Sequence, residues 1–265
     1  MRLCSIASGS SGNCYYLGTE TYGLFIDAGI GIRSIKKICK EYNLPLETIK
    51  GVFVTHDHAD HIKAVGHLAG KYNIPIYTTP EIHHGMSRSY CMTERISEAN
   101  TRFIHKEESL QIEDFTITCF EVPHDGSDNV GYCISIDGKV FSFLTDIGHI
   151  TETAGKYIGC ANYLILEANY DESMLQMGPY PAHLKARIAS PTGHMSNREM
   201  AEYLANHFPE GLQYLWLCHL SKDNNHPDLA FKTVELALKE KNIIVGRDVQ
   251  VIPLKRTSPS EIYSL

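Results

Sequence analysis

Apolar residues fall along the chain in short runs bounded by Gly, Pro, Asn and Asp, a pattern that predicts β-strands. The runs cover residues 3–7, 14–17, 23–26, 52–54, 74–77, 115–120, 130–136, 139–144, 162–166, 215–218 and 249–252. Apolar residues at helical spacing predict helices over residues 34–42, 64–72, 181–188, 196–208 and 228–241, and one that ends near residue 157. Residues 80–102 are less regular and predict a helical excursion, and the tail from Thr257 predicts no regular element.

Strand and helix patterns recur in two halves of the chain, one up to about residue 135 and one after it. The chain has 265 residues, of which 43% are hydrophobic, and this is enough for one large domain with a well-buried core. No linker-like stretch divides it, so we expect a single domain over residues 1–265. The pattern fits two mixed β-sheets packed face to face with helices outside, which is an α/β fold.

The densest group of chemically active side chains follows the strand predicted at residues 52–54. The seven residues from position 55 read Thr-His-Asp-His-Ala-Asp-His. Imidazole and carboxylate groups bind borderline divalent metals. His56 and His58, two residues apart in an extended loop, can point the same way, whereas Asp60 and His61 need the start of a helix to turn them. The stretch therefore indicates two metals; the alternative is a solvent-exposed polar loop.

Two polar residues outside this loop are candidate active-site residues because of the sequence around them. His194 lies in a Gly-containing loop just before a predicted helix that Ser196 or Asn197 would cap, which is a poor position for a core residue. Asp146 directly follows the strand predicted at residues 139–144. This strand-end position favours a metal ligand, and the alternative is a helix N-cap.

The turn Ser-Gly-Ser-Ser-Gly-Asn at residues 8–13 joins the first two predicted strands. An ordinary hairpin turn is one interpretation of it. The other is a backbone nest that binds an anion with help from Ser10, Ser11 and Asn13.

Charge and composition narrow the class of protein. The net charge is −7 and no Lys/Arg-rich block is present, so the chain has no strong electrostatic footprint for nucleic acid, although two metals would add about four local positive charges. The eight cysteines are scattered, which favours reduced thiols in a cytosolic protein. No secretory segment and no apolar run of about 20 residues is present, so we expect a cytoplasmic protein without membrane insertion.

The pattern His-x-His-x-Asp-His after a strand resembles the signature of the metallo-β-lactamase superfamily. Three further motifs resemble its YycJ/WalJ-like branch: Ser-Gly-Ser-Ser-Gly-Asn at 8–13, Leu-Glu-Ala-Asn-x-Asp at 166–171 and Gly-His-x-Ser-Asn at 193–197. The resemblance covers nearly the whole chain. It implies the αββα four-layer sandwich of the superfamily and the activity of a cytoplasmic phosphodiesterase. It also places the chain near tRNA 3′-processing nucleases and cyclic phosphodiesterases.

The resemblance also implies a set of metal ligands at strand ends. One metal would be held by His56, His58 and His124, a second by Asp60, His61 and His219, and Asp146 would bridge them. The metals would be two divalent ions, Zn²⁺ or Mn²⁺. Asp27, at the end of the strand predicted at residues 23–26, would brace the histidine loop without binding metal.

The implied activity is that of a metal-dependent hydrolase of phosphodiester bonds, a nuclease of the 5′-3′ DNA exonuclease type that uses a metal-bridging hydroxide. Asp60 would orient the nucleophile or accept its proton, and His194 would contact the phosphate or protonate the leaving group. The other candidate substrate-binding residues are Ser10, Ser11, Asn13, Ser196 and Asn197. Tyr170 departs from the branch, because many relatives have a histidine there.

Three alternatives to a nuclease remain: a small-molecule cyclic phosphodiesterase, a thioester or lactone hydrolase, and a non-catalytic signalling partner. The Gly-His-x-Ser-Asn loop disfavours the second, and the intact ligand set disfavours the third. His83 and His84 make a poor metal pair, because adjacent helical residues diverge by about 100°. DNA is favoured over RNA as the substrate, and strand polarity and oligomeric state stay open.

Overall fold

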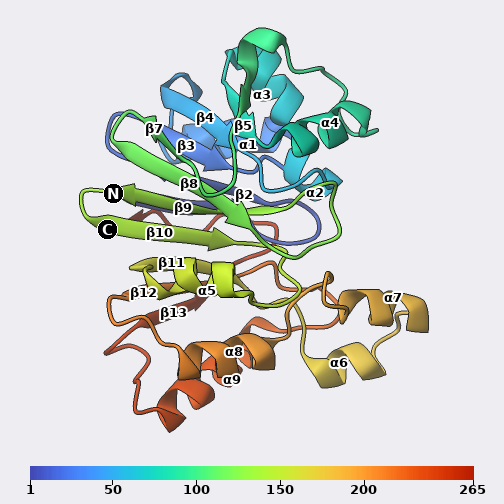
Figure 1. Cartoon of the computed structure of the whole chain (residues 1–265), viewed down its shortest axis with the longest axis vertical. Coiled ribbons are helices and arrows are strands. Elements are labelled where there is room, and N and C mark those ends of the chain that lie inside the picture. Colours follow the sequence, from blue (N-terminus) through green and yellow to red (C-terminus); the bar gives the residue numbers. More distant parts are fainter. The chain divides into compact units, whose positions relative to one another are not determined.

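The computed structural model describes residues 1–265 and divides into two compact units. The first unit comprises Met1–His105, Gly126–Asp128 and Lys255–Leu265, and the second comprises Lys106–Asp125 and Asn129–Leu254. Each unit contains one seven-stranded sheet (Figure 1). The single domain expected over residues 1–265 stays a prediction.

The sheet of the first unit combines antiparallel and parallel strands. It consists of β1 (Arg2–Ala7), β2 (Cys14–Gly18), β3 (Gly23–Ile26), β4 (Ile49–Phe53), β5 (Ile76–Thr78), β6 (Thr101–Phe103) and β14 (Tyr263–Ser264). Its strand order is β14-β1-β2-β3-β4-β5-β6. β1 to β3 pair antiparallel, whereas β3 to β6 run parallel. Because parallel strands end at the same edge of a sheet, the residues after β3 and β4 are brought together.

Four helices belong to the first unit, and their sequences explain where they form. They are α1 (Ile32–Glu41), α2 (Ala59–Ile62), α3 (Val65–Tyr72) and α4 (Pro80–Arg88), with single 3₁₀ turns at Leu46–Thr48 and Glu98–Asn100. α1 buries Ile35, Ile38 and Cys39 on one face and exposes its lysines on the other. α4 begins where the Thr79 side chain accepts a hydrogen bond from the Ile82 backbone N–H.

The sheet of the second unit has the same mixture of pairings. It consists of β7 (Ser109–Ile112), β8 (Phe115–Glu121), β9 (Val130–Ile136), β10 (Lys139–Leu144), β11 (Tyr163–Glu167), β12 (Tyr214–Cys218) and β13 (Gln250–Pro253). Its order is β13-β12-β11-β10-β9-β8-β7. β7 to β10 pair antiparallel, and β10 to β13 run parallel. Three consecutive parallel strands, β10, β11 and β12, therefore end at one edge.

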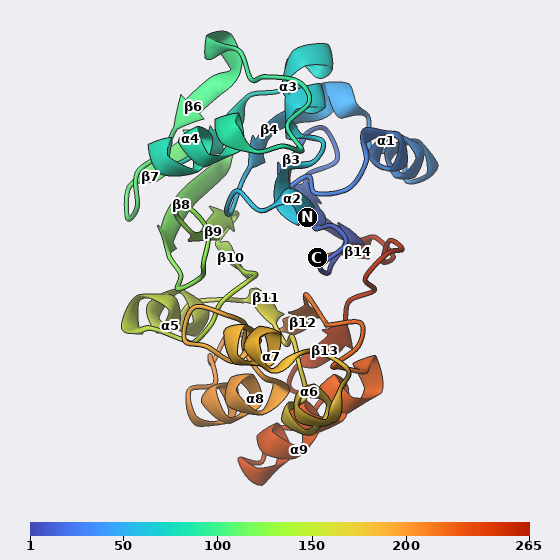
Figure 2. The same ribbon diagram turned by 90° about the vertical axis from the view of Figure 1, so that its right-hand side faces the viewer.

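The core of the second unit lies between this sheet and its helices. The helices are α5 (Glu152–Gly159), α6 (Glu172–Met177), α7 (Ala182–Ile188), α8 (Asn197–Asn206) and α9 (Pro227–Glu240). Leu164 pairs in register with Leu215, and Leu166 with Leu217, so the four side chains form one apolar patch. α5, α8 and α9 bury their apolar faces in the same core, and α8 and α9 lie side by side (Figure 2). Burial of each leucine stabilises the fold by roughly 1.5–3 kcal/mol.

The structure differs from the expectations in a few elements. The tail predicted to be irregular contributes β14, in which Ser264 pairs with Arg2 of β1. The helix expected over residues 64–72 is preceded by the separate short α2, and β6, β7 and α6 were not expected. These elements have two to six residues, too few for apolar periodicity to stand out from loop sequence.

The lengths of the helices show whether any of them could span a membrane. The longest, α9, has 14 residues, and no helix of the chain has the length and apolar character needed to cross a bilayer.

Candidate active site

The histidine loop of the first unit, residues 55–61, begins just after β4. His58 is the residue before the first turn of α2, and Asp60 and His61 lie within that turn. The rings of His56 and His58 are 4.6 Å apart between centroids, and those of His56 and His61 are 4.0 Å apart. His56 and His61 are buried, and His58 and Asp60 are partly buried. The short helix therefore gathers the three imidazoles, which lie two and three residues apart, into one cluster.

Asp27, directly after β3, is fully buried behind this loop. Its carboxylate accepts hydrogen bonds from the backbone N–H of Thr55 at 2.8 Å, from the Thr55 hydroxyl at 2.9 Å and from Nδ1 of His61 at 2.7 Å. Burial raises the pKa of Asp27, and the contacts with His61 and Thr55 oppose this rise. With Nδ1 of His61 engaged by the carboxylate, its Nε2 faces away from Asp27, and a metal bound there would replace the contact of this nitrogen with the Asn13 amide.

Thr55 extends the same arrangement to His56. Because the Thr55 hydroxyl donates to Asp27, its oxygen can accept a hydrogen bond from Nδ1 of His56, which lies 3.1 Å away. Nε2 of His56 is then the metal-binding nitrogen. One buried carboxylate thus orients two histidines of the loop, His61 directly and His56 through Thr55.

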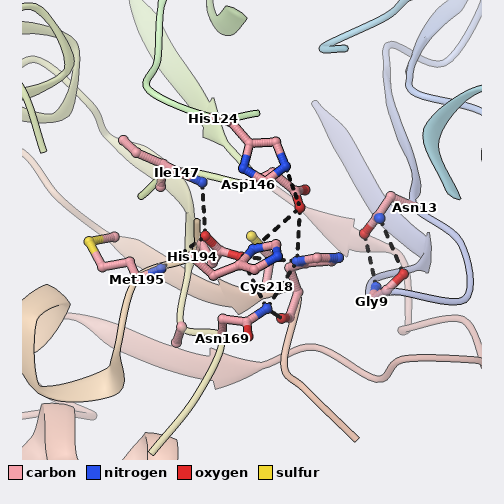
Figure 3. Close-up of polar contacts among 12 residues, drawn as sticks. Gly9, Asn13, His124, Asp146, Ile147, Asn169, His194, Met195 and Cys218 are labelled. Atoms are coloured by element: carbon pink, nitrogen blue, oxygen red, sulfur yellow. Dashed lines mark hydrogen bonds and ion pairs between the residues drawn. The ribbon is translucent and has the colours of Figure 1, made fainter. Parts of the chain in front are cut away.

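The turn at residues 8–13, for which an anion-binding role was one interpretation, contacts the histidine loop through Asn13. The side chain of Asn13 is fully buried, exchanges hydrogen bonds with the backbone of Gly9 and lies 2.9 Å from Nε2 of His61 (Figure 3). Ser10 and Ser11 are exposed. Asn13 therefore ties the turn to the histidine loop, and contact of Ser10, Ser11 or Asn13 with a substrate stays a prediction.

The second unit brings four acidic and imidazole side chains together at the ends of its parallel strands. Asp146, Glu167, His194 and His219 each offer an oxygen or nitrogen atom, and these atoms all lie within 4.8 Å of one another. Asp146 follows β10, Glu167 ends β11 and His219 follows β12, while His194 comes from the loop before α8. Figure 3 shows His194 between Asp146 and Asn169.

Glu167, which belongs to the motif at residues 166–171 but was given no individual role from the sequence, is the centre of this cluster. Its Oε1 accepts from Nδ1 of His194 at 2.8 Å and from Nδ1 of His219 at 2.9 Å. Its Oε2 accepts from the backbone N–H groups of Ile147 at 2.8 Å and Met195 at 3.3 Å. Both oxygens are thus engaged by hydrogen-bond donors, so Glu167 orients the two histidines rather than binding metal itself. Its one sequence signal is a carboxylate at the end of a buried strand.

Opposing effects act on the pKa values of Glu167 and His194. Burial would raise the pKa of Glu167, but the charge of His194 and hydrogen bonds from His194 and His219 outweigh it and lower the pKa. Burial would lower the pKa of His194, but Glu167 and Asp146 raise it above its ordinary value. The pair therefore favours a protonated imidazole next to an ionised carboxylate, as a proton donor needs.

His124 is oriented by the backbone of the loop that carries His194. Its Nδ1 donates to the carbonyl oxygen of Gly193 at 2.9 Å, which leaves Nε2 to bind a ligand. Burial is the largest effect on His124 and lowers its pKa, which favours the neutral form that a metal ligand needs. Oδ1 of Asp146 lies 3.8 Å from Nε2 of His124 (Figure 3).

Three of the candidate residues have left-handed backbone angles. The φ values are 58° at Asp27, 51° at Asp146 and 52° at His219. Each follows the last residue of a strand directly or by one position. Left-handed backbone costs a non-glycine residue roughly 1 kcal/mol, and such strain clusters at functional sites. Here it turns the side chain sharply away from the end of the strand.

Other predicted positions have structural roles of their own. Ser196 caps α8 and forms a capping box with Glu199, and the buried Asn197 bonds to Asn225. Thr151 caps α5, so the alternative role of Asp146 as the cap of that helix is wrong. A substrate contact by Ser196 or Asn197 stays a prediction.

Three further positions that the sequence analysis named are Tyr170, His83 and His84. Tyr170 is buried against Leu175 and Ile188, and burial raises its pKa to about 12. His83 bonds through Nε2 to the carbonyl oxygen of Arg102, and His84 is exposed. Neither histidine belongs to a cluster of metal-ligand type.

The donor set fits divalent metal ions. In both units imidazole Nδ1 atoms face oxygen acceptors, which is the arrangement by which proteins hold histidine ligands with Nε2 towards a metal. Nitrogen and carboxylate ligands suit Zn²⁺ and related ions.

Comparison with known proteins identifies the family. The sequence profile described as "Beta-lactamase superfamily domain" matches residues 23–214. The chain belongs to the metallo-β-lactamase superfamily. It is accordingly an enzyme, a metal-dependent hydrolase, and the α/β fold expected from the sequence is confirmed.

Two curated relatives match nearly the whole chain. The exodeoxyribonuclease YycJ of Bacillus anthracis is 32% identical, with 97% of this chain and 96% of the relative covered. The exodeoxyribonuclease WalJ of Streptococcus pneumoniae is 33% identical, with 93% and 91% covered. The chain therefore belongs to the YycJ/WalJ-like branch, as its motifs predicted. Human tRNase Z, short form, shares the fold with a TM-score of 0.67 at 17% identity, and all of both chains is covered.

Proposed function

We propose that this metal-dependent hydrolase cleaves phosphodiester bonds in nucleic acid and acts as a 5′-3′ DNA exonuclease. The observation that carries the proposal is the near-complete coverage by two relatives named exodeoxyribonucleases, at 32% and 33% identity. The proposal extends the activity in those names to this chain, and the direction of cleavage comes from the resemblance of its motifs to the same branch.

We assign the metal ligands according to the superfamily pattern. His56, His58 and His124 would hold one divalent ion, Asp60, His61 and His219 a second, and Asp146 would contact both. When bound, Zn²⁺ or Mn²⁺ would lower the pKa of water and stabilise negative charge on the reacting phosphate. The acceptors behind the histidines support this assignment, because Asp27 and Glu167 hold the rings of His61 and His219 in the required tautomer.

His194 is the proposed proton donor. Glu167 fixes its ring through Nδ1, so Nε2 is the atom that would bond a phosphate oxygen or protonate the leaving oxygen. The raised pKa of His194, caused by Glu167 and Asp146 against the effect of burial, favours the protonated form. Loss of a general acid typically lowers the rate by about 10²–10⁴-fold.

We assign substrate recognition to the turn at residues 8–13 and orientation of the water to the histidine loop. The exposed hydroxyls of Ser10 and Ser11 would contact a terminal phosphate, and Asn13 would hold their turn beside His61. Asp60 would orient the attacking water. We place the reaction in the cytoplasm, where the eight cysteines, which are all free thiols in the structure, would stay reduced.

The test is hydrolysis of end-labelled DNA and RNA, single- and double-stranded, by metal-loaded protein, with a chelator and the variant His194→Ala beside it. The proposal predicts stepwise shortening of DNA from the 5′ end, lost in both controls, and slower cleavage of RNA. Turnover of bis-p-nitrophenyl phosphate without cleavage of any nucleic acid would instead identify a small-molecule phosphodiesterase. Failure to hydrolyse either substrate would contradict the proposed phosphodiesterase activity and favour the thioester or lactone hydrolase.

A further inference from the structure

A second concave surface lies in the first unit, beside α4. A cavity of about 440 Å³ is lined by His83, Ser87, Met92, Arg95, Ile96 and Thr101. We call it the α4 pocket. Its volume falls within the range of pockets that bind small organic molecules.

Two exposed aromatic residues belong to the segment that forms the α4 pocket. Phe103 at the end of β6 is 59% exposed, and Tyr90 just after α4 is 90% exposed. They are the two aromatic residues among the six large hydrophobic side chains that are exposed in this chain. The ring of His83 contacts Phe103 edge-on, at 5.4 Å between centroids and 90° between planes. The rings of His83 and Phe103 thus form a ready-made surface for stacking a planar group.

Three arginines belong to the same segment of the chain, and one of them, Arg95, lines the α4 pocket. Arg88, Arg95 and Arg102 are exposed and form no ion pair with an acidic residue. Arg102 donates one hydrogen bond, to the carbonyl oxygen of Thr101.

The acidic residues of this segment do not cancel that charge at the pocket. Glu94 is occupied by His67 and Lys71 of α3, at 3.2 Å and 3.4 Å. Glu81 and Glu98 are exposed and line no part of the pocket. Arginine beside exposed aromatic rings is the combination that binds an anionic chain of planar groups.

α4 connects the pocket to the histidine loop. A Cβ atom on Gly85 would lie 2.0 Å from Oδ2 of Asp57, so α4 packs against the loop at this glycine. His83 and Ser87 are each two residues from Gly85 and therefore point to the other side of the helix. The pocket is thus about one helix diameter, roughly 10–12 Å, from the loop. That distance corresponds to about three stacked nucleotides at 3.4 Å each.

We propose that the α4 pocket binds an unpaired nucleotide of single-stranded nucleic acid, with a base stacked on Phe103 and a phosphate held by Arg95. The inference rests on the proposed nuclease function and adds a binding site for the strand about three nucleotides from the reacting phosphate. A duplex would have to open to use it, because the paired bases of a duplex have no free face to stack.

The test measures binding of a fluorescent single-stranded 12-mer to the metal-loaded His194→Ala protein, which we expect not to cut it. Into this background we add Arg95→Ala, Phe103→Ala and Phe103→Tyr, with Arg33→Ala on α1 as the matched control, since Arg33 is also exposed and unpaired. A 12-mer of abasic sites carries the same phosphates without bases. Thermal melting of each variant confirms that it is folded.

We expect Phe103→Ala and Arg95→Ala each to weaken binding about tenfold. Phe103→Tyr and Arg33→Ala should bind as the background does. Arg95→Ala should also lower the slope of log affinity against log salt by about 0.7. Phe103→Ala should leave that slope unchanged and have no effect on the abasic 12-mer, a result that damage to the fold would not produce.

Equal affinity of the background for the normal and abasic strands, or unchanged affinity in both alanine variants, would overturn the inference. Complete competition by inorganic polyphosphate together with strong abasic binding would show a general polyanion surface and would also overturn it. These outcomes are independent of the proposed function, which fails if the wild-type protein cuts no nucleic acid.

Discussion

Histidines of the candidate site are held from behind by oxygen atoms. Asp27 holds His61, Glu167 holds both His194 and His219, and the carbonyl oxygen of Gly193 holds His124. Each contact uses Nδ1, so that Nε2 faces away from the supporting oxygen. The directions of these four imidazoles are therefore fixed before any metal or substrate binds, which reduces the cost of ordering the site.

The variant Glu167→Gln tests the role of this carboxylate. A glutamine has the same shape, but its amide nitrogen cannot accept a hydrogen bond from an imidazole or from the backbone of Ile147. We expect metal affinity to fall about 10–100-fold, as measured by titration against a competing chelator. Glu172→Gln is the matched control, because Glu172 is partly exposed and pairs with Arg198 at 3.0 Å. Equal metal affinity in the two variants would contradict the role given to Glu167.

The reactivity of the Cys160 thiol should depend on pH in a defined way. A hydrogen bond from Cys133 lowers the pKa of the Cys160 thiol from 9.0 to about 7. The thiolate is the reactive form, so alkylation by iodoacetamide should speed up as the pH rises through about 7, two units below an ordinary thiol. Cys133→Ala should move this midpoint back towards 9. A midpoint that does not respond to Cys133→Ala would show that the hydrogen bond is not its cause.

At the residue scale, the sequence indicates the candidate metal ligands better than the residues that hold those ligands in place. The histidine loop is recognisable because its donors lie within six residues of chain, at positions 56–61. The role of Glu167 is not recognisable, because Glu167 lies 27 residues from His194 and 52 from His219 in the sequence. Only the folded chain brings these three residues together. Asn13 was one of three residues that an anion-binding turn would use, and the contact of its buried side chain with His61 was not foreseen.

Parallel strands position the acidic and imidazole groups at the scale of elements. β10, β11 and β12 end in register, so Asp146, Glu167 and His219 emerge at one edge although long segments separate them in sequence. β3 and β4 do the same for Asp27 and Thr55.

The loop between α7 and α8 depends on a glycine. A Cβ atom on Gly193 would lie 2.2 Å from the carbonyl oxygen of Arg187 and 2.3 Å from that of Ile188. Gly193→Ala should therefore push the loop away from α7 and displace both His124 and His194. We expect a loss of stability of about 1–3 kcal/mol by thermal melting and a lower kcat for any substrate.

The matched control for this change is Gly159→Ala in the last turn of α5. A Cβ atom there meets nothing within 4 Å, so this change should be neutral or slightly stabilising. A Gly193→Ala protein that melts and turns over like the Gly159→Ala protein would show that the close approach has no effect on the loop.

The sequence predicts most elements but misses the shortest. Long apolar runs such as those of β9 and β11 were found close to their observed bounds. β6, β7, β14 and α6 were missed, because their pairing or packing depends on neighbours that lie elsewhere in the chain. The irregular segment after α4 has no strong periodicity, although it carries Met92, Arg95 and Ile96, which line the α4 pocket.

Metal binding should stabilise the whole molecule. A ligand that binds the folded chain at a free concentration 100 times its Kd raises the free energy of unfolding by about 2.7 kcal/mol. We expect removal of metal by a chelator to lower the melting temperature and elemental analysis of the loaded protein to give about two ions per chain. One ion per chain would contradict the proposed pair of metals. An unchanged melting temperature would contradict the coupling of metal binding to folding.

The central claim is that this chain is a metal-dependent 5′-3′ DNA exonuclease, and release of label from DNA tests it most directly. Two preparations of one single-stranded DNA would be used, labelled at the 5′ end or at the 3′ end, with metal-loaded wild-type protein. The account predicts immediate release of small labelled products from the 5′-labelled strand. It predicts progressively shorter fragments from the 3′-labelled strand. Label retained in full-length DNA in both preparations, or released first from the 3′ end, would contradict it.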